Sequence, residues 1–378
     1  MKLTVPTNWQ QGLIDQIKRP SVNTVYGKMD WDFVGGGRSS CILERVSKSN
    51  VEAHISKIHK EGLKFHYLLN GTCLGNREFT QPGRKELDKL LDWLSQLNVD
   101  GVVVSLPFLL QYVKKNYPGF KISVSCLANI NSVEKAMFWE DLGADQITLS
   151  VSELNRDFKL LQEIRRNIVC SLQLIVNQNC LQDCPLYFYH SNIASHSSQS
   201  SIKQNISIDY CILMCSYKRI LEPVNFIRAS WIRPEDLIYY EKIGINSFKL
   251  VDRAMHVEAI ALAVEAYSKR SYRGNLYDLF LDESKSLICK KLNLFEKRKN
   301  YTQGLSGLEV CIDNTKLDGF IEHFLNTGCR YKSCKKCGYC YKIAARTVRI
   351  EPKYRKKALN NFDILFNKFF LKKQIFLK

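Results

Sequence analysis

The chain has 378 residues, 45% of them apolar, and its 55 Lys and Arg residues outnumber its 37 Asp and Glu residues to give a formal charge of +18. This composition excludes an intrinsically disordered chain, and the length excludes a small scaffold held together only by disulfides. The N-terminal segment lacks the apolar stretch of a secretion signal, and no later segment approaches the roughly 20 apolar residues of a membrane span. We therefore expect a cytoplasmic protein whose 14 cysteines are reduced and available for metal binding or redox chemistry.

Eight short runs rich in β-branched and aromatic residues predict strands. They cover 2–8, 23–28, 63–70, 100–107, 120–127, 145–152, 171–178 and 246–253. Segments with helical periodicity lie between them: Asn131 begins one that Gly143 ends, and Pro234 lies in the first turn of another. Because strands that alternate with helices form parallel sheets, the pattern predicts a (β/α)8 TIM-like barrel over residues 1–284.

A long interval separates the seventh and eighth predicted strands. The extra residues, 179–230, are expected to form an insertion, and their serine-rich stretch 190–207 is expected to be a surface loop without a helix. In a barrel, the segments after the C-terminal ends of the strands build the catalytic face. The insertion should therefore lie at that face.

Two C-x3-C pairs flank the serine-rich stretch. Cys180 and Cys184 directly follow the seventh strand, and Cys211 and Cys215 precede the eighth. The barrel would position the first pair, and the insertion can fold back to bring the second pair to the same metal. Four thiolates would complete a 4Fe-4S cluster or a zinc site. Alternatively, Cys211 is an ordinary apolar residue of its segment and another atom takes its place.

A second cysteine group lies in a predicted C-terminal module, residues 285–350. Within twelve residues it contains four thiols, those of Cys329, Cys334, Cys337 and Cys340. Their spacing is similar to that of ferredoxin-type ligands, whereas structural zinc more often uses two separated pairs. We predict a second iron–sulfur cluster, structural or electron-relaying, with zinc as the alternative.

The final segment, 351–378, has eight Lys and Arg residues and two acidic ones, so 8 − 2 gives +6. We predict a basic amphipathic helix that packs its Phe and Leu residues on the body, with membrane or nucleic-acid contact as the alternative. Two of the single cysteines, Cys126 and Cys170, lie in or beside strands and are expected to be buried apolar residues.

Polar residues at predicted strand ends are candidates for binding a substrate in the barrel mouth. Four of them are uncharged: Asn8, Asn70, Ser105 and Asn129. Three charged residues lie on or just after the eighth strand, Lys249, Asp252 and Arg253. Buried charges need partners, so they bind either one another or an anionic substrate group.

Two further features bear on the site. His190 and His196 lie close to the predicted thiol ligands, where an imidazole either exchanges protons or orders the loop. The run GGGR at 35–38 either places backbone amides near a phosphate or forms a flexible turn.

Three motifs resemble those of the U-32 or collagenase-like peptidases. They are VPTN at 5–8, N-x2-C-x3-C-P-x4-H from Asn177 to His190, and IRPEDL-x2-YE-x2-GI-x2-FKL-x2-R from Ile232 to Arg253. The segments around residues 266–276 and 312–320, with the final cysteine group, are similar to the C-terminal module of a subset of that family. The resemblance covers residues 1–350.

The resemblance implies a (β/α)8-like barrel with an iron–sulfur cluster held by four cysteines near its C-terminal face. Despite the family's name, its better-understood branches hydroxylate a ubiquinone precursor or RNA bases without oxygen. Cys180 and Cys184 match the first cluster cysteines, and Cys211 and Cys215 are the best matches for the others. The chain departs from the glutamate-to-cysteine signature of the peptidase-named branch.

Together these features predict an iron–sulfur redox enzyme that acts on a small-molecule or biosynthetic substrate. We expect His190, Lys249, Asp252 and Arg253 to carry catalysis. A peptidase is one alternative, although the sequence contains no HExxH or GxSxG motif. An RNA-modifying enzyme is the other, with RNA not favoured as a partner. The expected partners are an electron-donor protein and a related family member in a heterodimer.

Overall fold

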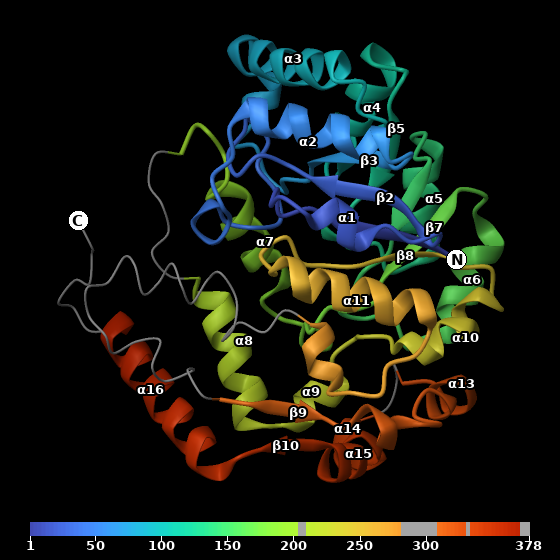
Figure 1. Cartoon of the computed structure of the whole chain (residues 1–378), viewed down its shortest axis with the longest axis vertical. Helices are drawn as coiled ribbons and strands as arrows, with labels where there is room; N and C mark the ends of the chain where they lie inside the picture. Colours follow the sequence, from blue (N-terminus) through green and yellow to red (C-terminus); the bar gives the residue numbers. More distant parts are fainter. Residues whose placement is uncertain (203–208, 281–307, 330–332, 371–378) are drawn as a thin grey trace.

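Eight short parallel strands close into a barrel in the computed structural model, which describes residues 1–202, 209–280, 308–329 and 333–370 (Figure 1). Each strand pairs with the next in sequence, and the eighth pairs with the first. The strands are β1 (Lys2–Pro6), β2 (Val22–Gly27), β3 (Lys64–Leu69), β4 (Gly101–Val104), β5 (Lys121–Val124), β6 (Gln146–Thr148), β7 (Ser171–Ile175) and β8 (Ser247–Lys249). The predicted (β/α)8 architecture and all eight predicted strands are confirmed.

Helices cover the outside of the barrel because its strands are apolar on both faces. All four residues of β4 are buried, with alternate side chains directed into the barrel and onto the surrounding helices. The covering helices are α1 (Leu13–Ile17), α2 (Lys48–Lys60), α3 (Gln81–Gln96), α4 (Pro107–Asn116), α5 (Val133–Asp141), α6 (Phe158–Asn167), α10 (Leu237–Glu241) and α11 (Val257–Lys269). Short 3-10 turns are η1 (Ser40–Ile42), η2 (Arg77–Phe79), η3 (Cys126–Ala128), η4 (Pro234–Asp236), η5 (Leu276–Leu279) and η7 (Asn314–Leu317).

The start of α5 differs from the prediction. Ser132, not Asn131, caps the helix, and its hydroxyl accepts a hydrogen bond from the backbone N–H of Lys135. The amide of Asn131 instead contacts Glu153 in the loop after β6. Pro234 begins η4, which leads directly into α10, as its position in a first helical turn predicts.

The insertion after β7 is largely helical, so the prediction of a surface loop over 190–207 is wrong in its first half. It contains α7 (Tyr187–His196), α8 (Tyr210–Leu221) and α9 (Val224–Arg228). Serine side chains fit here because their hydroxyls bond to the backbone: Ser191 donates to the carbonyl of Tyr187, and Ser198 donates to that of Ala194. Ser198 is also buried. Residues 203–208 lie outside the described part of the chain.

A smaller unit packs beside the barrel, below it in Figure 1. It consists of the antiparallel pair β9 (Val310–Ile312) and β10 (Val348–Ile350), with α13 (Glu322–Thr327), α14 (Cys334–Cys337), α15 (Tyr339–Thr347) and α16 (Pro352–Phe370). Arg233 of the barrel anchors this unit through hydrogen bonds to the side chain of Asn314 at 2.8 Å and the carbonyl of Leu317 at 2.6 Å. The predicted start of the module at residue 285 lies outside the described residues.

Helix α16 lies alongside α8 (Figure 1). Phe362 is 1% exposed, and its ring centroid lies 5.8 Å from that of Tyr217. Arg355 donates to the carbonyls of Ile220 and Leu221 at the end of α8. The predicted packing of the basic tail on the body is therefore confirmed for residues 352–370. No helix in the described ranges combines the length and apolar character needed to cross a bilayer.

Candidate active site

A cavity lies at the end of the barrel where the C-terminal ends of the strands meet. Its walls come from the ends of β2, β3, β5, β7 and β8, the loop that contains Gly37, and helix α7. The cavity brings together six of the residues singled out from the sequence, Asn70, His190, Lys249, Asp252, Arg253 and Cys180. These residues are spread over more than 180 positions of the chain, and the barrel collects them because it directs every strand end to one face.

Lys249, the last residue of β8, places a buried ammonium group in the cavity. The residue is 7% exposed, and its Nζ lies 4.0 Å from the ring centroid of Tyr26. Among the described residues no carboxylate pairs with it. Burial lowers the pKa of Lys249 from 10.5 to about 8, and the positive charge of Arg253 adds to the effect, whereas the Cys126 thiol opposes it. The cavity therefore contains a cation whose charge is only partly compensated.

Arg38 reaches the same cavity and pairs with Asp252. Burial alone would raise the pKa of the Asp252 carboxyl, but the charge of Arg38 and its hydrogen bond lower the pKa below the usual value. The internal pairing of Asp252 considered from the sequence is thus present, and its partner is Arg38. Three cations, Arg38, Lys249 and Arg253, share the cavity with this single carboxylate.

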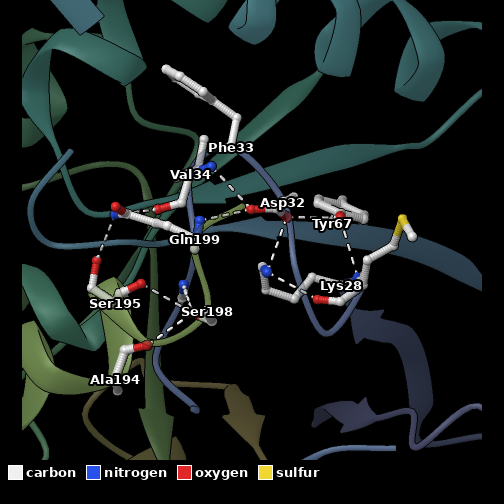
Figure 2. A network of polar contacts seen from close by, with 12 residues as sticks. Lys28, Asp32, Phe33, Val34, Tyr67, Ala194, Ser195, Ser198 and Gln199 are labelled. Carbon is white, nitrogen blue, oxygen red and sulfur yellow. Dashed lines mark hydrogen bonds and ion pairs between the residues drawn. The ribbon is translucent and has the colours of Figure 1, made fainter. Parts of the chain in front are cut away.

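A buried polar network holds the loop that carries Arg38. Asp32 forms an ion pair with Lys28, 3.0 Å between Oδ2 and Nζ, and it accepts a hydrogen bond from Tyr67 at 2.9 Å (Figure 2). Its other carboxylate oxygen accepts from the backbone N–H groups of Val34 and Gly35. Because each of these groups is buried and partnered, the loop is fixed relative to β2 and β3.

The segment after α7 closes over this loop from the other side. Gln199 donates to the carbonyl of Val34 at 3.2 Å, and Ser198 accepts from the N–H of Gly36 (Figure 2). Gln199 also donates to the carbonyl of Cys73 at 2.6 Å. The backbones lie so close that a Cβ added to Gly35 would be 2.4 Å from the carbonyl oxygen of Ser195. The insertion therefore shapes one wall of the cavity through backbone contacts that require glycine.

His190 of α7 lines the cavity and pairs with Asp209, with 3.2 Å between Nε2 and Oδ2. A carboxylate at this distance orients the imidazole ring. His196, the other histidine of this helix, has a buried Nε2 with no hydrogen-bond partner among the described residues, and it does not line the cavity.

The first four predicted thiol ligands lie on two neighbouring segments. Cys180 lines the cavity and accepts a hydrogen bond from the side chain of Gln178 at 3.2 Å. Cys211 is buried in the first turn of α8, and the Cys215 thiol donates to the carbonyl of Ile212 in its own helix. Arg219 of α8 joins the segments by donating to the carbonyl of Asn179 at 2.7 Å.

Several features of these segments fit a 4Fe-4S cluster. Thiols are the usual cluster ligands, and the guanidinium of Arg219 beside the first pair would offset the cluster's negative charge. Both polar atoms of the Asn179 side chain are buried without a partner among the described residues, so this amide has unused hydrogen-bonding capacity next to Cys180. As the side chains lie, no three ligating groups of the described residues gather around one point. The donor chemistry and surroundings fit, and ligation requires the thiols to turn toward one another.

The second thiol group lies in the C-terminal unit at α13, α14 and α15. Cys329 accepts from the side chain of Gln182 at 3.8 Å, and Cys337 lies 3.7 Å from Nε2 of His323. Residues 330–332, between the first two cysteines of the group, lie outside the described part of the chain.

Three of the predicted substrate-binding residues do not line the cavity. Asn8 donates to the carbonyl of Met255, Ser105 donates to that of Asn70, and Asn129 accepts from the hydroxyl of Ser150. Asn129 has a φ of 51°, a turn conformation that asparagine tolerates well. Their polar groups therefore bond within the barrel mouth, those of Asn8 and Ser105 to backbone carbonyls and that of Asn129 to a side-chain hydroxyl.

Arg38 and Cys126 are among the cavity residues that the sequence did not predict as such. The GGGR run drew attention to Arg38 only through its glycines, and both Gly37 and Arg38 line the cavity. Cys126 was expected to be a buried apolar residue, but it follows β5 and lines the cavity. Its position directly after a strand is the signal that would have found it.

Comparison with known proteins identifies similar chains. The sequence profile of peptidase family U32 matches residues 36–275. A Methanocaldococcus jannaschii protein named as an uncharacterized protease is 31% identical over 323 residues, which are 85% of this chain and 87% of that protein. The structure of the U32 peptidase Mk0906 superposes with a TM-score of 0.51 and 22% identity, covering 67% of this chain and 93% of that one. At this identity the superposition bears on the fold alone.

Proposed function

The chain belongs to peptidase family U32, and from this premise we propose that it is an iron–sulfur enzyme that binds an anionic small molecule in the barrel cavity. The proposed reaction class is redox modification of that molecule, such as oxygen-independent hydroxylation. Cys180, Cys184, Cys211 and Cys215 would hold a 4Fe-4S cluster, which when bound supplies one-electron transfer. With water as the oxygen source, hydroxylation would convert a substrate C–H group to C–OH with release of two electrons and two protons, and a separate redox protein would take up the electrons through the cluster.

One observation carries this proposal: a thiol of the first C-x3-C pair and an excess of buried cations share one cavity. Cys180 lines the cavity with Arg38, Lys249 and Arg253, while Asp252 is the only carboxylate among the described residues of the lining. Three positive charges and one negative charge leave a net of two positive charges. A buried charge is unfavourable unless it is paired, so this cavity favours a ligand with one or two negative charges.

The cavity residues then have distinct roles. Lys249 and Arg253 would bind the anionic group, because no carboxylate of the described residues pairs with Lys249. Asp252 would hold Arg38 in place as a third contact. Asn70 would orient the neutral part of the ligand, since its Oδ1 is buried without a partner among the described residues. The fixed loop around Asp32 would exclude water from one side.

The test is anaerobic purification of the full chain with iron, acid-labile sulfide and zinc measured per chain. We expect iron and sulfide in equal amounts, a visible absorbance that dithionite bleaches, and in a Cys180→Ser, Cys184→Ser variant the loss of the iron, sulfide and absorbance of one cluster, with any remainder held by the second thiol group. A Cys170→Ser variant is the matched control, because Cys170 lies beside α6 and does not line the cavity. Protein that carries zinc and neither iron nor sulfide would exclude the proposal.

A peptidase is the second candidate, favoured by the His190–Asp209 pair. An imidazole oriented by a carboxylate at 3.2 Å is the arrangement of a general base, and His190 lines the cavity. The name of the Methanocaldococcus jannaschii relative agrees with this candidate. A peptidase should cleave members of a fluorogenic peptide library aerobically and lose this activity on His190→Ala replacement. If the iron-containing protein cleaves no peptide, this candidate is excluded.

A further inference from the structure

A buried arginine at the junction between the barrel and the C-terminal unit has no carboxylate partner in the part of the chain that the structure describes. Arg156, in the loop after β6, is 6% exposed, and it donates to the carbonyls of Ile227 at 2.6 Å and Ala229 at 2.5 Å. Its Nε is buried and has no hydrogen-bond partner among the described residues. A guanidinium does not lose its proton in a protein, so the charge has to be balanced by its surroundings.

Aromatic rings from both sides of the junction surround this guanidinium. Its central carbon lies 4.6 Å from the ring centroid of Trp231 in the barrel, and 4.8 and 5.2 Å from those of Phe320 and Phe324 in the C-terminal unit. The ring of Tyr339 stacks on Phe320 at 5.8 Å, which brings the next residue, Cys340, to the same place. The rings attract the cation, but they supply no negative charge.

Four ionisable groups lie close enough to Arg156 to act on its charge, those of Cys340, Tyr240, Cys329 and Asp236. Burial raises the pKa of Asp236 to about 7, so this carboxyl carries only part of a charge at neutral pH, and burial keeps the Tyr240 phenol neutral by raising its pKa. The thiols of Cys340 and Cys329 remain. A metal ion would convert them to thiolates by displacing their protons.

The loop of the first cysteine pair reaches the same thiols. Gln182 lies between Cys180 and Cys184, and its side-chain N–H group points to the sulfur of Cys329 at 3.8 Å. Amide N–H groups that donate to sulfur are common around metal-bound thiolates, where they offset the negative charge. Two residues on the barrel side of the junction thus face the thiol group of the C-terminal unit. Arg156 contributes a full positive charge, and Gln182 contributes the dipole of its amide.

We propose that Arg156 and Gln182 complete a metal–thiolate centre formed by Cys329, Cys334, Cys337 and Cys340 across the junction. Four thiolates around a divalent ion or an iron–sulfur cluster carry a net negative charge, which the guanidinium balances. Metal binding must turn Cys337 away from His323, which it now contacts, toward the other three thiols. The centre does not depend on the chemistry proposed for the barrel cavity.

The experiment uses the full chain with Cys180→Ser and Cys184→Ser, so that the barrel thiols contribute no metal. Iron, sulfide and zinc are measured per chain after anaerobic purification, and alkylation followed by mass spectrometry reports which cysteines are protected. We expect bound metal, with all four cysteines of the group, Cys329, Cys334, Cys337 and Cys340, protected. Iron together with sulfide would identify a cluster, and zinc alone would identify a zinc site. Either result supports the proposal. If Cys334→Ser, Cys337→Ser changes neither metal content nor protection, the proposal is overturned.

The role of the barrel residues is tested by the rate at which a chelator removes this metal. Arg156→Gln should release it at least tenfold faster than the parent, Arg156→Lys should fall between them, and Gln182→Leu should also accelerate release. Arg165→Gln is the matched control, because Arg165 likewise donates to two backbone carbonyls but lies on α6 away from the thiols. If Arg156→Gln fails to fold, Gln182→Leu and Arg156→Lys decide the question. Equal release from these variants and the control would overturn the proposal.

Discussion

Replacing Lys249 by Met should stabilise the protein while removing a binding group. The difference between a pKa of 10.5 and one of about 8 corresponds to about 3 kcal/mol of folding free energy, since each tenfold change in protonation is worth about 1.4 kcal/mol. Below pH 8 the lysine is protonated in both the folded and the unfolded state. The whole penalty for burying the charged ammonium group then lowers the free energy of unfolding. Methionine fills similar volume without a charge, so we expect the free energy of unfolding at pH 7 to rise by up to about 3 kcal/mol.

The free energy of unfolding of the wild type should depend on pH in a direction that follows from the lowered pKa of Lys249. Between pH 8 and 10.5 the folded protein has released the Lys249 proton while the unfolded chain still binds it, so the stability of the wild type rises with pH in this window. The Lys249→Met variant lacks this rise, and its advantage over the wild type should shrink as pH increases from 7 to about 10. Urea unfolding followed by tryptophan fluorescence at several pH values measures the difference.

The control is Lys121→Met, at the first residue of β5. Its side chain is 71% exposed, so replacement should change the free energy of unfolding by less than about 0.5 kcal/mol at every pH. A small dicarboxylate should raise the melting temperature of the wild type and of Lys121→Met but not of Lys249→Met. Destabilisation of Lys249→Met by more than about 1 kcal/mol at pH 7 would refute the reasoning, because it would mean that the ammonium has a compensating partner.

Three further predictions concern the elements that shape the site, each measured by urea unfolding. Gly71→Ala should cost at least about 2 kcal/mol because its Cβ would lie 2.1 Å from a backbone oxygen, whereas Gly119→Ala meets nothing within 4 Å and should be neutral. Asp32→Asn should cost about 3–5 kcal/mol, since it leaves a buried ammonium unpaired. Phe362→Ala should cost about 3–5 kcal/mol and the half-exposed Ile364→Ala less than about 1 kcal/mol. Equal destabilisation by Gly71→Ala and Gly119→Ala would contradict the close backbone contact at Gly71. Equal destabilisation by Phe362→Ala and Ile364→Ala would contradict the burial of Phe362 between α16 and the body.

The barrel could be predicted because the sequence signal for each of its strands lies within a few consecutive residues. Each strand is a short apolar run bounded by turn residues, and a parallel strand buried on both faces leaves this mark in the sequence itself. Local sequence patterns did not predict α7. Its serine residues, whose hydroxyls bond to the helix backbone or pack against Gly71, are also typical of loops. The capping residue of α5 was one position away from the predicted one for a similar reason: Asn131 and Ser132 are both good caps, and only the contact with Glu153 decides between them.

For the site, the sequence identified Lys249, Asp252, Arg253 and His190 as chemically notable, and the cavity contains all four. It placed Asn8, Ser105 and Asn129 at strand ends correctly, but it had no means of showing whether each side chain faces the cavity or the backbone. The metal roles of the cysteines stay a prediction.

By itself, then, the sequence determined the eight-unit repeat, the grouping of its cysteines and the kinds of charge near the strand ends, because these depend on residues close together in the chain. The tertiary structure alone decided which charges are left without partners. Arg38 meets Asp252 across 214 positions, Lys249 meets a tyrosine ring and no carboxylate of the described residues, and Arg156 is enclosed by a separate unit. Whether a charge is compensated depends on what lies within a few ångströms in space, and that distance bears no fixed relation to separation along the chain.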